Sequence, residues 1–330
     1  MSILKTKQAP LSGALTAALA ELRIDPDLDR VGVGGRSVEA SDPVAFRAAL
    51  ASALYELWHA GTAGRDVGPA GLRRSPDYER ELTAVFPHAR TAAKGTVRAL
   101  PDGDGLGVIE VNRVRISVPP EVVAGHAPGD TIVVELPAAR PMLSPGFLYA
   151  KGSAGGTDGS AVLRMYLHVE AAEYGPGIWR TVLGALEGRG ARYGAKALSR
   201  PGGHPRRDAI VVYLPEGSWS CVPELVRALA GATGLGEATS VLARRVAPGL
   251  ALAWEPTDTR PGRARVSFGQ HRAMAVACGV VRHMSDGVEL AQAVAEELTA
   301  AGADPAEPAR NVDSPAFPEA GVAGRGGGGS

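Results

Sequence analysis

The chain has 330 residues, of which 45% are hydrophobic and 21% are charged, so it is long enough for two domains with buried cores. Its formal net charge is zero, which argues against sequence-independent binding to nucleic acid. The sequence contains no apolar run of the roughly 18 residues that a membrane span requires, and no signal-peptide pattern. We therefore expect a cytoplasmic protein without a nucleic-acid or membrane partner.

The first half of the chain is predicted to form two regions. Residues 1–94 are mainly helical, because helical spacing runs through 12–24 and 43–60. Residues 95–145 form a small β-rich unit, since β-branched residues alternate or cluster between turn signals such as PDGDG and HAPGD. This unit is a candidate for binding a peptide or a partner by addition of a strand to its edge.

Residues 146–300 are predicted to form an α+β domain, with a mixed, mainly antiparallel sheet flanked by helices. One helix is marked by the spacing of Trp179, Val182, Leu183 and Leu186. The remaining elements are a strand that starts at Arg164, strands at 192–198, 207–214 and 263–269, and helices at 222–231, 271–283 and 287–300. Residues 301–330 are rich in proline, alanine and glycine, so we expect a disordered tail, and its final GGGGS resembles an engineered linker.

The predicted strands have one apolar face and one polar face. In RMYLHVEAA, apolar residues alternate with Arg164, Tyr166, His168 and Glu170. Lys196 shares its face with Arg192 and Gly194, and the next two strands add Arg207 with Tyr213 and Arg265 with Ser267. A solvated sheet face is the simpler explanation for any single strand. Taken together, the strands favour a site for a dianion such as a phosphate monoester, because fifteen Lys/Arg face nine Asp/Glu between residues 164 and 272.

The residues other than arginine suggest the chemistry. The chain has only five lysines, and an amine among arginines has a lowered pKa, so Lys196 is a candidate base. His168 is a candidate acid. A base, an acid and a phosphate clamp on one surface suit β-elimination of phosphate from phosphoserine or phosphothreonine. We expect no metal or other cofactor, because the arginines offset the phosphate charge.

Three segments resemble the core of the HopA-type effector family, whose bacterial relatives include the lyase components of class V lanthipeptide and thioamitide biosynthesis. The segments are RMYLHVEAA, ARYGAKALSRPGGHPRRDAIVVYLP and LARRVAPGLALAWEPTDTRPGRARVSFGQHRA. The resemblance covers roughly 140–285 and extends, more distantly, to phosphothreonine lyase effectors and to the lyase domains of class III and IV lanthipeptide synthetases. It implies a lyase that removes phosphate from Ser/Thr of a ribosomally made precursor peptide, after phosphorylation by a separate kinase-like partner.

The resemblance also implies roles for individual residues. Lys196 corresponds to the base lysine, His168 to the acid, and Arg207 with Tyr213 to the phosphate-side strand. The lysine of the family's Lys-x-His strand is replaced by Tyr166, so either His168 or Tyr166 protonates the leaving group. Arg164 or Lys151 then supplies the missing charge, and Arg265 and Arg272 are further phosphate-binding candidates.

An alternative function belongs to another class. A non-catalytic, effector-like module could bind a phosphorylated partner or a host protein without turnover. Such a module would keep the arginines but would have no need of Lys196.

Overall fold

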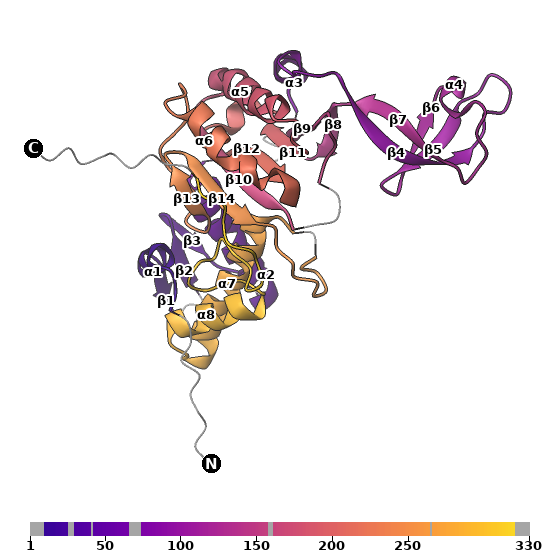
Figure 1. The fold of residues 1–330 in the computed structure, drawn as a ribbon. Coiled ribbons are helices and arrows are strands. Elements are labelled where there is room, and N and C mark those ends of the chain that lie inside the picture. The colour runs from indigo at the N-terminus through magenta and orange to yellow at the C-terminus, as the bar shows by residue number, and fades with distance from the viewer. Residues whose placement is uncertain are drawn as a thin grey trace, which may run out of the picture.

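The computed structural model of the chain describes residues 10–25, 30–40, 42–65, 74–157, 161–264 and 266–320. Over these residues it contains eight α-helices and three antiparallel sheets, of three, seven and four strands. This architecture confirms the α+β class. The seven-stranded sheet lies inside a compact body, and the four-stranded sheet projects from one side of it (Figure 1).

The central sheet holds most of the predicted strands of the second half of the chain. Its order is β13-β14-β10-β12-β11-β9-β8, and every neighbouring pair is antiparallel. The strands are β8 (Ala139–Ser144), β9 (Phe147–Lys151), β10 (Leu163–Val169), β11 (Gly194–Leu198), β12 (Arg206–Leu214), β13 (Arg244–Ala247) and β14 (Leu250–Trp254).

One face of this sheet packs against three helices: α3 (Pro76–Ala84), α5 (Gly175–Gly188) and α6 (Val222–Leu229). The helical spacing predicted from the sequence is confirmed, because Trp179, Val182, Leu183 and Leu186 of α5 are all buried in this layer. Short 3₁₀ turns connect the elements here: Ala172–Tyr174, Pro201–Gly203 and Glu216–Cys221.

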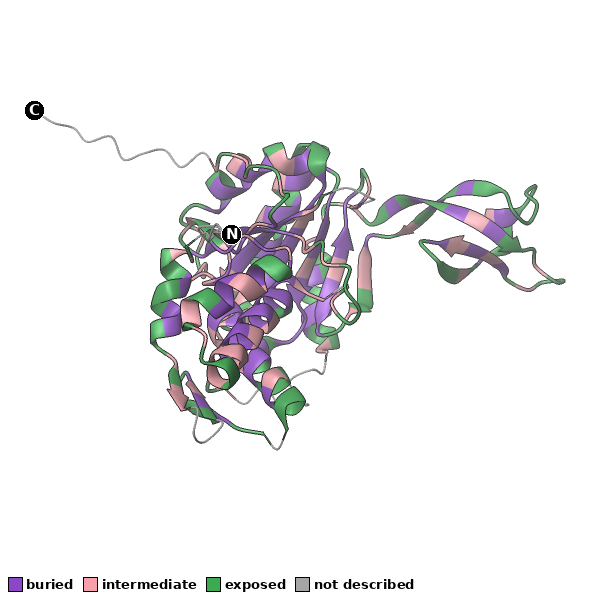
Figure 2. Cartoon of the chain, turned by 90° about the horizontal axis from the view of Figure 1, so that it is seen from below, coloured by how far each residue is buried: buried purple, intermediate pink, exposed green. Residues whose placement is uncertain are grey.

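The other face of the central sheet is covered by the two ends of the chain. Tyr166, Val211 and Ala253 of the sheet share a hydrophobic core with N-terminal and C-terminal helices, whose sheet-facing sides are buried and whose outer sides are exposed (Figure 2). The N-terminal helical region therefore packs onto this face and does not stand apart. The elements of this layer are α1 (Gly13–Ala20), α2 (Pro43–Leu54), a π-helical turn η2 (Tyr55–Ala60), α7 (Phe268–Asp286), α8 (Leu290–Ala300) and the small sheet β1 (Arg23–Asp25), β2 (Arg30–Val33) and β3 (Arg36–Val38).

The prediction of a strand at 263–269 is wrong. Ser267 is the N-cap of α7, its hydroxyl accepts from the Gln270 backbone N–H, and the Gln270 side chain bonds back to the Ser267 N–H. This capping box starts a helix at Phe268. The missing strand is β14, whose five residues are all buried and so show no alternation in the sequence.

The β-rich unit consists of β4 (Arg90–Ala99), β5 (Gly107–Val111), β6 (Val114–Val118), the short α4 (Pro120–Val123) and β7 (Thr131–Pro137), in the sheet order β6-β5-β4-β7. It begins five residues before the predicted start at residue 95. Buried and exposed residues alternate along β4 and β7 (Figure 2), and the buried ones form a separate small core.

The prediction of disorder is wrong for residues 301–320 of the tail. Ala309 accepts a backbone hydrogen bond from Trp254 of β14, and Ala303 pairs with Asn311 across a β-bridge. The ring of Phe317 stacks on that of Trp254, with 5.8 Å between centroids. The composition led to the wrong prediction because alanine and proline also occur in segments that pack against a folded core. Residues 321–330, with the GGGGS segment, lie outside the described residues.

If this tail is part of the core, then Phe317→Ala should destabilise the protein. We expect a loss of about 1–2 kcal/mol in the free energy of unfolding, because a stacked aromatic pair is removed. Urea unfolding measures this, with Val312→Ala as the control, since Val312 is 64% exposed. Equal stability of the two variants would contradict the docking of the tail.

Candidate active site

The register of three strands brings four of the predicted site residues together. Tyr166 lies opposite Val211, and Val211 lies opposite Lys196. In the next row, Arg164 lies opposite Tyr213. These four side chains therefore occupy two adjacent rows on the face covered by the N-terminal and C-terminal helices.

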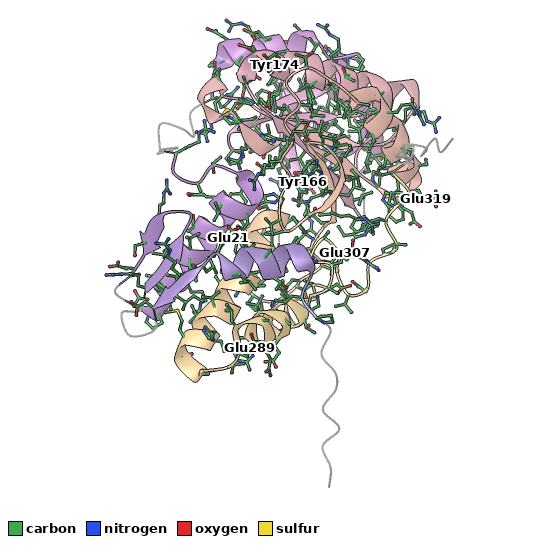
Figure 3. All side chains as sticks on the ribbon, turned by 90° about the vertical axis from the view of Figure 1, so that its left-hand side faces the viewer. Glu21, Tyr166, Tyr174, Glu289, Glu307 and Glu319 are labelled. Atoms are coloured by element: carbon green, nitrogen blue, oxygen red, sulfur yellow. The ribbon has the colours of Figure 1, made fainter. Side chains whose placement is uncertain are left out.

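This face is not solvated, because Arg164 is 7% exposed and Tyr166 is 3% exposed. Figure 3 shows Tyr166 deep in the body, where the sheet meets the helices. Gly194, in the row of Tyr213, is needed for packing, since a Cβ there would lie 2.1 Å from the Tyr149 hydroxyl. The space beside this glycine is thus occupied by the Tyr149 ring.

Arg164 is held by an ion pair and an aromatic ring. Its Nε and Nη2 both donate to the Glu255 carboxylate, which follows β14 directly. Its guanidinium carbon lies 5.1 Å from the centre of the Tyr213 ring. A two-point contact with a carboxylate fixes the orientation of the guanidinium plane. Burial raises the pKa of Tyr213 to about 12, so its phenol stays protonated.

A second buried ion pair arises from an irregularity in β12. Leu167 lies opposite Ile210, whereas Val169 lies opposite Arg206. Between these two pairs the chain advances by two residues in β10 but by four residues in β12. This bulge turns Arg206 and Asp208 toward the helix-covered face. Their side chains form an ion pair there.

Two residues of η2 complete the surroundings of that pair. Arg206 donates to the Tyr55 hydroxyl at 2.7 Å, and the Tyr55 hydroxyl lies 3.3 Å from Asp208 Oδ2. His59 Nε2 lies 3.7 Å from the same oxygen, and burial lowers the pKa of His59 to about 4. Burial alone would raise the pKa of Asp208, but the charge of Arg206 outweighs it and holds that pKa well below its usual range.

Lys196 lies among these charges. Its amine makes no hydrogen bond or ion pair within the part of the chain that the structure describes, and its Nζ lies 4.1 Å from the centre of the Phe147 ring. Burial lowers the pKa of Lys196 to about 8; Asp208 opposes this shift, and Arg164 and Arg206 add to it. An amine with this pKa is a suitable base near neutral pH.

His168 and Arg207 lie elsewhere on this face. The ring Nδ1 of His168 is hydrogen-bonded to the Ala238 carbonyl at 3.0 Å, which requires Nδ1 to be the donor, and burial lowers its pKa. Arg207 donates to the carbonyls of Leu57 and Trp58 in the middle of η2. Arg207 was expected in the site, but Arg206 is the arginine of this pair that acts on the Lys196 amine, whereas Arg207 contacts η2.

Tyr166 is enclosed by aromatic rings. Its centroid lies 4.9 Å from that of His59 in an edge-to-face arrangement and 5.9 Å from that of Phe268. Its hydroxyl is buried and forms no hydrogen bond with the described residues; burial raises its pKa above the ordinary phenol value, although the nearby charge of Arg164 opposes this shift. Tyr166 is therefore a protonated phenol with an unused donor.

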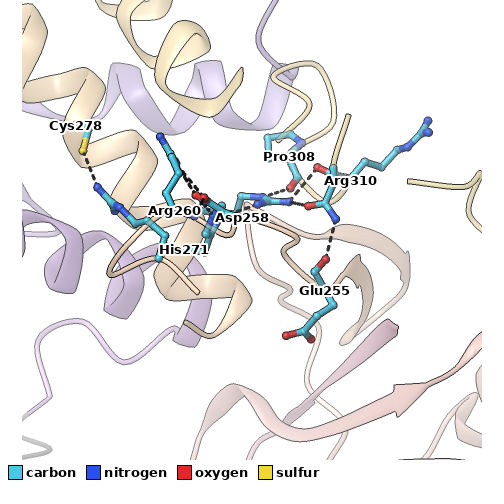
Figure 4. A network of polar contacts seen from close by, with 10 residues as sticks. Glu255, Asp258, Arg260, His271, Cys278, Pro308 and Arg310 are labelled. Carbon is cyan, nitrogen blue, oxygen red and sulfur yellow. Dashed lines mark hydrogen bonds and ion pairs between the residues drawn. The ribbon is translucent and has the colours of Figure 1, made fainter. Parts of the chain in front are cut away.

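Arg272, a predicted phosphate ligand, is instead hydrogen-bonded to the C-terminal tail at residues 308–311. Its guanidinium donates to the carbonyls of Pro308 and Arg310, to Asn311 Oδ1 and to His271 Nδ1, at 2.7–3.0 Å. Figure 4 shows this network, in which Asn311 also bonds to the Glu255 carbonyl. Arg272 is fully buried, so its guanidinium is not available to a phosphate in this arrangement.

The last two predicted residues have no such clear position in the site. Lys151 ends β9 opposite Gly194 and is 8% exposed. Arg265 lies outside the described residues. Sequence reasoning missed Arg206, Asp208, Glu255 and Phe147; the RRD triplet contained the first two, but only the bulge decides which of its residues face the site.

The described residues contain no group of three or more His, Cys, Asp or Glu side chains that could hold a metal ion. Nor do they include a helix with the length and apolar character needed to cross a membrane.

No curated protein sequence matches the chain. Among solved structures, it is similar to the effector protein from Pseudomonas syringae pv. tomato strain DC3000, at 15% identity and a TM-score of 0.46, over 79% of this chain and 90% of that one. It is also similar to the effector protein from Pseudomonas syringae pv. syringae strain 61, at 13% identity and a TM-score of 0.44, over 74% of this chain and 82% of that one.

A sequence model of the HopA1 effector protein family matches residues 138–310. This range starts just after the β-rich unit and includes β8 to β14, α7, α8 and the first half of the docked tail. The chain belongs to the HopA1 effector protein family.

Proposed function

We propose that the chain is a lyase that eliminates phosphate from phosphorylated Ser or Thr of a ribosomally synthesised precursor peptide, leaving dehydroalanine or dehydrobutyrine. The observation that carries this proposal is the unpaired amine of Lys196, half-buried between the Arg164–Glu255 and Arg206–Asp208 pairs. A site that only bound phosphate would have no need of an amine whose neutral form is favoured.

The pKa of Lys196 matters for the amount of base available. At pH 7, about a tenth of an amine with a pKa of about 8 is neutral, compared with about 0.03% at an ordinary pKa of 10.5. The neutral fraction is thus larger by about 300-fold. The neutral amine takes the α-proton, the electrons of the Cα–H bond form the Cα=Cβ double bond, and the Cβ–O bond breaks as phosphate leaves.

The departing phosphate gains negative charge that the site must offset. Arg164 and Arg206 lie on either side of the amine and supply fixed positive charge. Tyr166 and Tyr213 lie beside Arg164 and remain protonated. These phenols are better placed to donate a proton to the leaving oxygen than His168, whose Nδ1 is bonded to Ala238.

The proposed partners are the precursor peptide and a kinase-like protein that phosphorylates it. Support for a docking surface comes from large hydrophobic residues on the surface. Of the eight that are most exposed among the described residues, six lie between residues 100 and 143, on the β-rich unit and the edge strand β8. Exposed apolar side chains gathered in one region are typical of interaction sites.

The direct test is incubation of the purified protein with a synthetic phosphothreonine peptide, followed by mass spectrometry. We expect loss of one phosphoric acid from the peptide and a rate at least about 10²-fold lower in Lys196→Ala. Lys94→Ala is the matched control, since Lys94 is an exposed lysine on β4. Unchanged elimination in Lys196→Ala would refute the mechanism, and phosphopeptide binding without any elimination would favour the non-catalytic module.

The titration of Lys196 can be measured separately from activity. Reductive methylation with ¹³C-formaldehyde labels the lysines, of which the chain has only five, and NMR follows each resonance against pH. The resonance that is missing in Lys196→Met should titrate with a midpoint near pH 8. Because the neutral amine is the base, the elimination rate should rise with pH through the same midpoint. A midpoint above pH 10 would contradict the proposed role.

A further inference from the structure

Arg200 is a buried cation without a partner among the residues that the structure describes. It follows β11 by two residues and is 9% exposed. Its Nε atom is buried and has no hydrogen-bond acceptor, and the guanidinium forms no ion pair with any residue that the structure describes. A buried charge in a folded protein is normally paired, because removal from water is costly.

The charges that face Arg200 are also positive. Arg206 and Arg65 lie near it, and burial together with these two cations lowers its pKa. Arg65 donates to the carbonyls of His204 and Pro205. The carboxylate of Asp208 already pairs with Arg206. His204 adds no positive charge near neutral pH, since burial lowers its pKa.

This group of arginines adjoins the proposed catalytic amine. The guanidinium carbon of Arg206 lies 5.8 Å from the centre of the Phe147 ring, and Lys196 Nζ lies 4.1 Å from the same point. Gly203 makes room for Arg200, because a Cβ there would lie 3.2 Å from Arg200 Nε and 2.6 Å from Leu198. The Phe147 ring therefore contacts both the Lys196 amine and Arg206, which belongs to this group of arginines.

The amine thus has a cationic group on each side. Arg164 with Tyr213 lies toward the last residues of β12, and Arg206 lies at the first residue of that strand. Arg206 lies opposite Val169, five residues along β10 from Arg164, which corresponds to about 17 Å of backbone. The backbone at the two arginines is far enough apart for each arginine to serve a different anionic group.

We propose that Arg200, together with Arg65 and Arg206, binds a second anionic group of the substrate, next to the phosphorylated residue from which Lys196 removes the proton. This inference rests on the proposed function and specifies its substrate: a phosphopeptide with a further carboxylate or phosphate near the reacting residue. Both groups are oxyanions that match the donor geometry of arginine. The reacting phosphate is assigned to Arg164 and Tyr213.

Binding of labelled phosphothreonine peptides, followed by fluorescence anisotropy, tests the proposal without depending on turnover. One peptide has neutral flanks, a second series moves a single glutamate through the flanking positions, and a third series replaces that glutamate with a second phosphothreonine. At one or more positions the second anion should tighten binding about tenfold, and the two series show whether carboxylate or phosphate is preferred. Measurements in the wild-type protein and in Lys196→Met separate binding from elimination.

The variants then assign the effect to Arg200. In Arg200→Gln the tenfold gain should disappear, while affinity for the neutral-flank peptide changes by less than about twofold; Arg200→Lys should keep part of the gain. Arg227→Gln, which alters an exposed arginine of α6, is the control for net charge. Thermal unfolding checks folding, and Arg200→Gln should be no less stable, because it removes an unpaired cation.

Two results would overturn the proposal. The first is the absence of any gain from a second anion at every position tested. The second is an equal loss of affinity for all peptides in Arg200→Gln, which would assign Arg200 to the reacting phosphate. A gain that depends on Arg200 in a protein that shows no elimination would support the second-anion site and reject the lyase.

Discussion

Two arginine–carboxylate pairs, the half-buried Arg164–Glu255 and the buried Arg206–Asp208, determine the electrostatics of the central sheet's helix-covered face. Each pair keeps a guanidinium charged in a place from which water is largely excluded. Lys196 lies between them with no carboxylate of its own, so burial and two fixed cations favour its neutral form. The lowered pKa of this amine is therefore a consequence of how the arginines are paired, and the proposed chemistry depends on it.

The helices that cover the face make this arrangement possible. The turn η2 contributes Tyr55 and His59 to the surroundings of Asp208, and α7 contributes Phe268 beside Tyr166. The docked tail reaches the same region from the other side, because Asn311 bonds to the backbone of Glu255. Segments from both ends of the chain thus exclude water from one site, which strengthens every charge interaction within it.

The sequence predicted the parts of this site that depend on local alternation. It placed Arg164 and Tyr166 on one face of β10, and it identified Lys196 by its rarity among arginines. It could not predict the bulge in β12, which brings Arg206 and Asp208 to the face of Lys196, because the register shift depends on pairing with β10. It also missed β14, where burial on both faces removes alternation, and the tail, whose order comes from contacts with Trp254 and Arg272. Local pattern specified the strands, whereas tertiary contacts decided which side chains meet.

Chemical rescue tests the central claim most directly, because it asks whether a neutral amine at the position of Lys196 performs the reaction. The account predicts that Lys196→Ala regains part of its phosphate elimination when methylamine or ethylamine is added, in proportion to the concentration of the neutral amine. Tetramethylammonium, which carries charge but cannot accept a proton, should have no effect. Elimination by Lys196→Ala at the wild-type rate without amine, or equal rescue by tetramethylammonium, would contradict the account.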